Sequence, residues 1–287
     1  MLAGLLAQVL NGVQYGLLLF LIGSGLTLIF GVMGVINLAH GSLFMIGAYL
    51  AFAVVAATGQ FWLALPLAIA GGAVLGTVLE RLLFRRFRTR PHMDQVLLTF
   101  ALILLFEEAR SAVFGNQFHS VAIPAGLDFS VPVVAGFRYS AYRLAVLAIC
   151  LAIAAGMVWL IERTRTGSAI RAAAEDAAML DLLGVDATRI HRLVFAGGTA
   201  LAMLAGALAA PLQSVYPGMG DGFLILSFIV VVIGGLGSVA GAFWGALLVG
   251  MTDTMAKAYV PQAGGIAVCA MMAAVLIWRP AGLSGRG

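Results

Sequence analysis

The sequence has few charged residues, a single lysine, two cysteines and 8 prolines among its 287 residues. Charged side chains make up 10% of the chain and hydrophobic ones 62%, whereas a soluble globular domain averages about 25% charged and about 45–50% apolar residues. This composition excludes a water-soluble globule and an intrinsically disordered chain. Cys150 and Cys269 each lie in an apolar stretch, so we expect two small buried hydrophobes and no disulfide or metal pair.

Motifs for nucleotide hydrolysis and metal binding are also missing. The only lysine, Lys257, follows Asp-Thr-Met-Ala, so the chain contains no phosphate-binding loop ending in Gly-Lys-Ser/Thr. The four histidines, His40, His92, His119 and His191, show no metal-binding spacing, and no Gly-x-Ser-x-Gly occurs. We therefore expect no catalytic residue, no metal site and no cofactor in this chain.

What the sequence does contain is a series of long apolar runs. A helical crossing of a bilayer needs about 20 apolar residues, so the runs predict an all-α polytopic membrane protein with eight or nine transmembrane or re-entrant helices in one domain over residues 1–287. The runs are 5–30, 35–57, 61–83, 95–113, 142–161, 193–210, 223–233, 239–256 and 264–278. Run 223–233 is short for a crossing, and the side on which the N-terminus lies depends on the final count.

The basic residues gather in three segments. Five arginines lie within 81–90, five within 163–192, and two near the end, Arg279 and Arg286. Short basic loops of membrane proteins face the cytoplasm, so these segments and the C-terminus are predicted to be cytoplasmic. Membrane topology thus accounts for the net charge of +4, and no nucleic-acid partner is expected.

Two glycine-rich segments resemble each other once one residue is gapped. They are residues 30–41 and 233–245, and each follows a run rich in Ile, Leu and Val. Many transporters are built from two repeats with broken helices at matching places, so the similarity indicates a possible internal repeat. The alternative is that the glycines allow helices to pack closely.

Polar residues within the apolar runs must face protein or water, because hydrocarbon leaves their hydrogen bonds unsatisfied. They are candidates for lining a substrate pathway, although each one also suits a hydrogen bond between helices. Glu107 and Arg110 are three residues apart, and we expect them to form an ion pair near the outer interface. The pathway candidates are Gln14, Asn37, His40, Ser42, Thr99 and Ser238.

Residues 162–192 form a charged loop on the predicted cytoplasmic side. Ser168 is expected to cap a helix over 169–183 that ends at Gly184, and a second helix to start near Asp186 or Thr188. The first helix is too short and too charged to cross a membrane. It either lies on the membrane surface or docks into a groove of a cytosolic protein.

Three segments together resemble the LivH-type permease subunits of branched-chain amino acid ABC importers. They are residues 25–42 with Gly47 and Tyr49, residues 171–176 with 183–185, and residues 234–242. The resemblance covers nearly the whole chain, and Ile-Asn-Leu-Ala-His-Gly at 36–41 is its most specific part. It implies a multi-pass subunit of the bacterial inner membrane, surrounded by lipid. It also implies a second, similar permease, two cytosolic ATPases that use ATP and Mg, and a periplasmic substrate-binding protein.

The resemblance further implies that the loop within 162–192 couples this chain to the ATPases. The coupling candidates are Arg171, Glu175, Asp176 and Gly184. ABC importers carry a Glu-Ala-Ala sequence and then a glycine in this loop, whereas this chain has Asp176-Ala-Ala followed later by Gly184. The departure leaves the contact residues open.

Transport by alternating access is the implied mechanism, with branched-chain or other small neutral amino acids as cargo. A permease subunit for urea or short amides is similar to this family and remains an alternative. An ATP-independent channel for small solutes is another, but it leaves the charged loop without a function. An intramembrane enzyme with His40 as base would lack a nucleophile and a metal partner.

Overall fold

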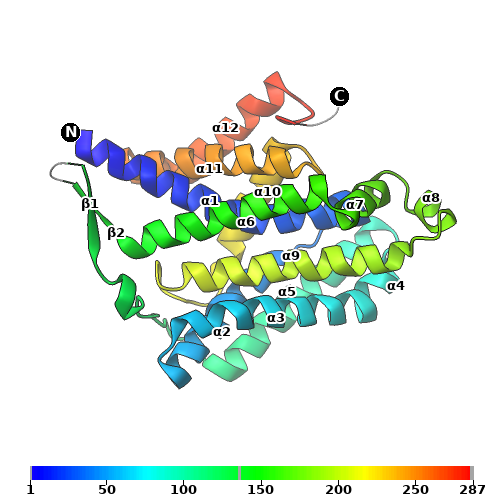
Figure 1. Ribbon diagram of the computed structural model, residues 1–287, viewed down its shortest axis with the longest axis horizontal. Helices are drawn as coiled ribbons and strands as arrows, with labels where there is room; N and C mark the ends of the chain where they lie inside the picture. Colours follow the sequence, from blue (N-terminus) through cyan, green and yellow to red (C-terminus); the bar gives the residue numbers. More distant parts are fainter. Residues whose placement is uncertain (1, 135–136, 285–287) are drawn as a thin grey trace.

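The computed structural model describes residues 2–134 and 137–284. It is a bundle of helices that run mainly along one axis, with a small antiparallel hairpin at one end and short helices at the other (Figure 1). The helices are α1 (Leu2–Met33), α2 (His40–Thr58), α3 (Phe61–Leu79), α4 (Arg85–Phe87), α5 (His92–Phe114), α6 (Ala141–Arg163), α7 (Arg165–Glu175), α8 (Ala177–Leu182), α9 (Ala187–Ala209), α10 (Met219–Gly234), α11 (Val239–Tyr259) and α12 (Gly264–Trp278). The shorter elements are η1 (Glu80–Phe84), η2 (Ala125–Leu127), β1 (Ser130–Val134), β2 (Phe137–Ser140) and η3 (Pro261–Ala263).

Within the described residues, seven helical segments are long and apolar enough to cross a membrane. They are Gly4–Met33, His40–Thr58, Phe61–Phe87, Ala141–Arg163, Ala187–Ala209, Val239–Tyr259 and Pro261–Trp278. Helix α5 is also long, but Asp94, Glu107, Glu108 and Arg110 lower its hydropathy, and α10 is apolar but shorter. All nine predicted runs fall on these helices, which confirms an all-α polytopic membrane protein.

Helix α1 occupies the centre of the bundle. It packs against α6, α9, α10 and α11, and Leu17, Leu19, Leu21 and Ile22 are completely buried. Burial away from water does not by itself hold helices together in lipid, so close backbone approach between small residues matters more. A Cβ added at Gly72 on α3, for example, would lie 2.6 Å from the Cα of Ala200 on α9.

The two glycine-rich segments are both helix breaks. Helix α1 ends just before Gly34, whose φ is +66°, and α10 ends just before Gly235, whose φ is +95°. After each break a side chain accepts a hydrogen bond from a nearby backbone N–H. The Asn37 side-chain oxygen accepts a hydrogen bond from the Ala39 N–H at 3.1 Å, and the Ser238 hydroxyl accepts one from the Gly241 N–H at 3.0 Å.

The two breaks also lie against each other. A Cβ added at Gly31 would lie 2.8 Å from the Cα of Gly237. The glycines of these segments therefore serve both purposes considered from the sequence, since some interrupt helices with a positive φ and others allow two backbones to touch.

The charged loop folds differently from the prediction at two places. Helix α7 starts at Arg165 and not after Ser168, because the Thr164 hydroxyl accepts a hydrogen bond from the Gly167 N–H at 3.0 Å. The expected single helix over 169–183 is also wrong, because Asp176 leaves the helical conformation and caps α8 through the N–H groups of Ala178 and Met179. Aspartate favours caps over helix interiors for this reason.

The end of the loop agrees with the prediction. Gly184 has a φ of +81°, as the end of a helix requires. Asp186 caps α9 by accepting a hydrogen bond from the Arg189 N–H at 3.2 Å. Of the two cysteines, both free, Cys150 is buried as expected, whereas Cys269 is exposed. The prediction for Cys269 is wrong because α12 packs on one side only, against α10 and α11.

Candidate functional site

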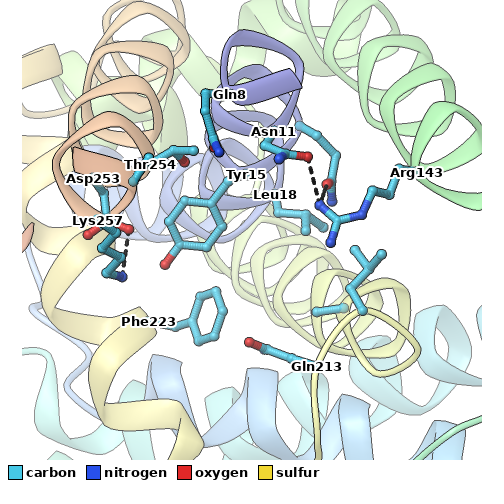
Figure 2. Close-up of a pocket in the computed structure, with 14 residues that line it drawn as sticks. Gln8, Asn11, Tyr15, Leu18, Arg143, Gln213, Phe223, Asp253, Thr254 and Lys257 are labelled. Carbon is cyan, nitrogen blue, oxygen red and sulfur yellow. Dashed lines mark hydrogen bonds and ion pairs between the residues drawn. The ribbon is translucent and has the colours of Figure 1, made fainter. Parts of the chain in front are cut away.

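A polar cavity lies at the end of the bundle that carries the hairpin, since the lining residue Asn11 is bonded to Tyr139 on β2; Figure 2 shows the residues that line it. We call it the hairpin-end cavity. Its volume is about 460 Å³, which lies within the range of about 300–1,000 Å³ typical of sites for small molecules. It lies between α1, α6, α10 and α11 and the chain at the end of α9. Its lining is Gln8, Asn11, Gln14, Tyr15, Leu18, Arg143, Ala209, Leu212, Gln213, Phe223, Asp253, Thr254, Lys257 and Ala258.

One wall of the cavity carries the guanidinium of Arg143. Its Nη1 donates hydrogen bonds to Asn11 Oδ1 at 2.8 Å and to Gln14 Oε1 at 3.4 Å. The hydroxyl of Tyr139, on β2, donates to the same Asn11 oxygen at 3.0 Å. Burial raises the pKa of Tyr139 above its ordinary value, and nearby Arg143 opposes that shift. Tyr139 therefore stays protonated at neutral pH and holds Asn11, which in turn holds Arg143.

The opposite wall carries a carboxylate. Asp253 on α11 accepts a hydrogen bond from Lys257 Nζ at 2.7 Å, one helical turn further along. The side chain of Asp253 is 5% exposed, whereas that of Lys257 is 57% exposed. The Lys257 Nζ also lies 5.9 Å from the centroid of the Tyr15 ring. In Figure 2 the Asp253–Lys257 pair and Arg143 lie on opposite sides of Tyr15.

Between the two walls the surface is mostly apolar. Tyr15 and Phe223 meet edge to face with ring centroids 6.0 Å apart, and Leu18 and Leu212 complete this surface. Gln213 adds a polar group, and its buried Nε2 has no hydrogen-bond partner among the described residues. The cavity thus combines a guanidinium on one wall, the Asp253–Lys257 ion pair on the other and an apolar floor, which suits a small molecule with both charges and a hydrocarbon body.

A second cavity lies at the other end of the bundle, and we call it the α7-end cavity. Its volume is about 720 Å³. It lies where the ends of α1 and α10, helix α7 and the C-terminal segment meet. It brings together Arg171, Glu175 and Ser238, two coupling candidates and one pathway candidate. The C-terminal segment is held there because the Leu283 N–H donates to the Ile233 carbonyl at 2.8 Å.

The other pathway candidates lie in neither of these two cavities, apart from Gln14 in the hairpin-end cavity. Asn37, His40, Ser42 and Thr99 are buried between helices. His40 Nε2 shares a hydrogen bond with the Ile22 carbonyl at 3.1 Å, and the Thr99 hydroxyl donates to the Val96 carbonyl at 3.0 Å. The structure shows hydrogen bonds within the bundle for Asn37, His40 and Thr99, and the place of all four residues on a pathway stays a prediction.

Two coupling candidates act on the shape of the loop. Asp176 caps α8, and Gly184 provides the turn between α8 and α9. Arg171 donates a hydrogen bond to the Ile161 carbonyl and so ties α7 to the end of α6. Among the described residues, no group of three or more His, Cys, Asp or Glu is arranged to hold a metal.

Sequence reasoning missed most of the hairpin-end cavity. Asn11, Arg143 and Asp253 come from three helices far apart in the sequence, and only the fold brings them together. One signal was present, because Asp253 and Lys257 are four residues apart and such pairs share a helix face. The predicted ion pair of Glu107 and Arg110 is confirmed, with an N–O distance of 3.1 Å.

The fold defines a multi-pass membrane protein with a polar cavity at one end of its bundle. Residues 8–277 match the family described as "Branched-chain amino acid transport system / permease component". The chain belongs to this family. No solved structure matches it.

Three relatives are similar over most of the chain. It is 30% identical to the high-affinity branched-chain amino acid transport system permease protein BraD of Pseudomonas aeruginosa, over 98% of this chain and 96% of BraD. It is 31% identical to the permease protein LivH of Escherichia coli K12, with the same coverage. It is 27% identical to the permease protein LivM of Salmonella typhimurium, over 92% of this chain and 67% of LivM. All three relatives are transport permease subunits.

Proposed function

We propose that this chain is a membrane-spanning subunit of an ATP-driven importer for branched-chain or other small neutral amino acids. The hairpin-end cavity carries this proposal, because a guanidinium on one wall, a carboxylate paired with a displaceable lysine on the other and an apolar floor match an amino acid with a hydrocarbon side chain. The names of the relatives support the same cargo. A neutral amide such as urea would offer no carboxylate to the guanidinium of Arg143.

The orientation in the membrane follows from the basic segments. Residues 81–90 and 163–192 lie at the end of the bundle with α4, α7 and α8, opposite the hairpin (Figure 1). By the positive-inside rule this end is cytoplasmic, so the C-terminal segment beside α7 is cytoplasmic and the start of α1 is outside. The hairpin-end cavity then faces the periplasm of the bacterial inner membrane, where a substrate-binding protein would deliver the cargo.

The cytoplasmic end has the features of a docking site for ATPase subunits. Leu182 and Leu183 follow one another in α8 and the turn after it, and they are 81% and 74% exposed. They lie at the end of the bundle that carries α7 and α8, and the bundle itself does not cover them. We propose that α7 and α8 dock into the two ATPases, which bind ATP and Mg, and that Arg171, Glu175, Asp176 and Gly184 transmit their movement.

A second, similar permease completes the assembly in this proposal. Branched-chain amino acid transport systems have permease proteins of two names, LivH and LivM, and this chain is similar to both. Exposed apolar side chains such as Leu97 on α5 and Ile277 on α12 would face either this partner or membrane lipid. The chain itself lacks a phosphate-binding loop, so the energy must come from the partner ATPases.

Uptake by the purified complex in proteoliposomes tests the function. We expect [³H]leucine uptake that needs the binding protein outside and ATP inside. Uptake of urea but not leucine would establish the amide alternative. Uptake without ATP or ATPase subunits would establish a channel and contradict the proposed importer.

A further inference from the structure

Lys257 holds its ammonium group against two features of the hairpin-end cavity. One is the buried carboxylate of Asp253, 2.7 Å from Nζ, and the other is the ring of Tyr15, whose centroid is 5.9 Å from Nζ. A carboxylate and an aromatic face are the two groups that proteins commonly use to bind an ammonium. The α-ammonium of an amino acid and the lysine side chain are both primary ammonium groups with three N–H donors.

The pair is unequal in its access to water. Asp253 is 5% exposed and needs a cation nearby, because a buried charge without a partner is strongly unfavourable. Lys257 is 57% exposed, and its flexible stem allows the ammonium to move into water at little cost. Another ammonium can therefore replace Lys257 while the charge of Asp253 stays neutralised.

Two donors in the rest of the cavity could bind a ligand carboxylate. Gln213 Nε2 is a buried donor without a hydrogen-bond partner among the described residues, and Arg143 brings a positive charge to the wall opposite Asp253 (Figure 2). A carboxylate would satisfy both. Leu18 and Phe223 offer an apolar surface for a hydrocarbon side chain.

We infer that Asp253 and the face of Tyr15 form a recognition site for the α-ammonium of the transported amino acid, and that Lys257 occupies this site until the substrate displaces it. The inference rests on the proposed function and names the residues that read the substrate. Exchange of one ammonium for another keeps the site neutralised at every stage. It also lets the substrate leave easily, because Lys257 can return.

Binding of [³H]leucine to the purified complex, without the binding protein, tests the inference. Lys257→Met removes the competing ammonium, so we expect leucine to bind about tenfold more tightly, a free-energy difference of about 1.4 kcal/mol. Asp253→Asn should weaken binding by about the same factor, and Asp253→Glu should restore part of it. If the pair is merely structural, Lys257→Met will leave leucine affinity unchanged or lower it, and that result would overturn the inference.

Competition in the wild-type complex and in Asp253→Asn gives a second measurement that does not depend on the lysine variant. The competitors are 4-methylpentanoate, which is leucine without its amine, and 3-methylbutylamine, which is leucine without its carboxylate. We expect the amine to compete with leucine in the wild type and to bind about tenfold more weakly in Asp253→Asn. The acid should bind equally well to both proteins. Equal loss of both competitors would contradict an ammonium site.

Asp128→Asn is the matched control, since Asp128 is an exposed carboxylate in the loop before β1 and does not line the cavity. It should behave as the wild type. Two failures can be told apart. If the wild-type complex takes up no leucine, the proposed function fails, and the inference with it. If uptake is normal but neither variant changes binding as expected, only the inference fails.

Discussion

Glu80 and Arg192 form an ion pair that joins the end of α3 to the first turns of α9, with 3.4 Å between Arg192 Nε and Glu80 Oε2. Glu80 is fully buried and begins the π-helical turn η1, whereas the side chain of Arg192 is 25% exposed. Arg88 and His191 are hydrogen-bonded beside it. The start of α9, which follows directly on α7 and α8, is therefore fastened to α3 by charged groups near the proposed cytoplasmic face.

The unequal burial of this pair predicts an unequal effect of mutation. Arg192→Met leaves a buried carboxylate without a cation and should lower the free energy of unfolding by about 3–5 kcal/mol. Glu80→Gln leaves a partly exposed arginine and should cost about 1–2 kcal/mol. Thermal unfolding of the purified protein, followed by circular dichroism, measures both. Equal losses would contradict the role given to burial.

Glycines on α9 allow a second comparison. A Cβ added at Gly206 would collide with the Phe44 carbonyl on α2, whereas a Cβ at Gly197 meets nothing within 4 Å. We expect Gly206→Ala to destabilise the protein by about 1–3 kcal/mol through overpacking. The control Gly197→Ala should be neutral or stabilising by about 0.5–1 kcal/mol, because alanine favours the helix. Size-exclusion profiles at rising temperature compare the two, and a stable Gly206→Ala protein would show that α2 can move away from α9.

The sequence sufficed for the membrane class, because runs of apolar residues report directly on helices that cross a bilayer. It also singled out residues 30–41 and 233–245, where the breaks at Gly34 and Gly235 lie, but it left open whether their glycines interrupt helices or allow close packing. It failed at Asp176, where a local side-chain cap competes with a helix that composition alone favours.

The hairpin-end cavity was beyond sequence reasoning for a different reason. Its charged groups, Arg143 and Asp253, lie on α6 and α11, and no local pattern encodes that two helices so far apart in sequence face one cavity. The candidates chosen from the sequence were polar residues within the apolar runs, such as Asn37. Asn37 and Ser238 lie at helix breaks, where each accepts a hydrogen bond from a nearby backbone N–H.

Tyr139 predicts a pH effect on stability at alkaline pH. Burial raises its pKa above the unfolded value of 10.0, so the protonated form is favoured by folding. The resulting stability is fully present below pH 10.0 and is lost as pH rises through the higher folded pKa. Tyr139→Phe should cost about 0.5–1.5 kcal/mol at neutral pH, because the hydrogen bond to Asn11 is lost.

The Tyr139→Phe variant has no hydroxyl at this position to titrate, so it should not lose this stability at alkaline pH. The difference in melting temperature between the wild type and Tyr139→Phe should be constant from about pH 7 to about pH 9 and shrink above about pH 10. A difference that grows with pH would have the wrong sign and would contradict a buried, protonated tyrosine.

Leu182 and Leu183 provide the test of the docking surface. Because both are highly exposed at the end of the bundle, Leu182→Asn with Leu183→Asn should leave the free energy of unfolding within about 0.5 kcal/mol of the wild-type value. If these leucines bury against an ATPase, each substitution should weaken the free energy of binding to the ATPase by about 1.5–3 kcal/mol. The ATPase subunits should then be lost during purification. Arg189→Gln, exposed at the same end, serves as the control and should retain them. Full recovery of ATPase subunits with the doubly substituted chain would exclude these leucines from the contact.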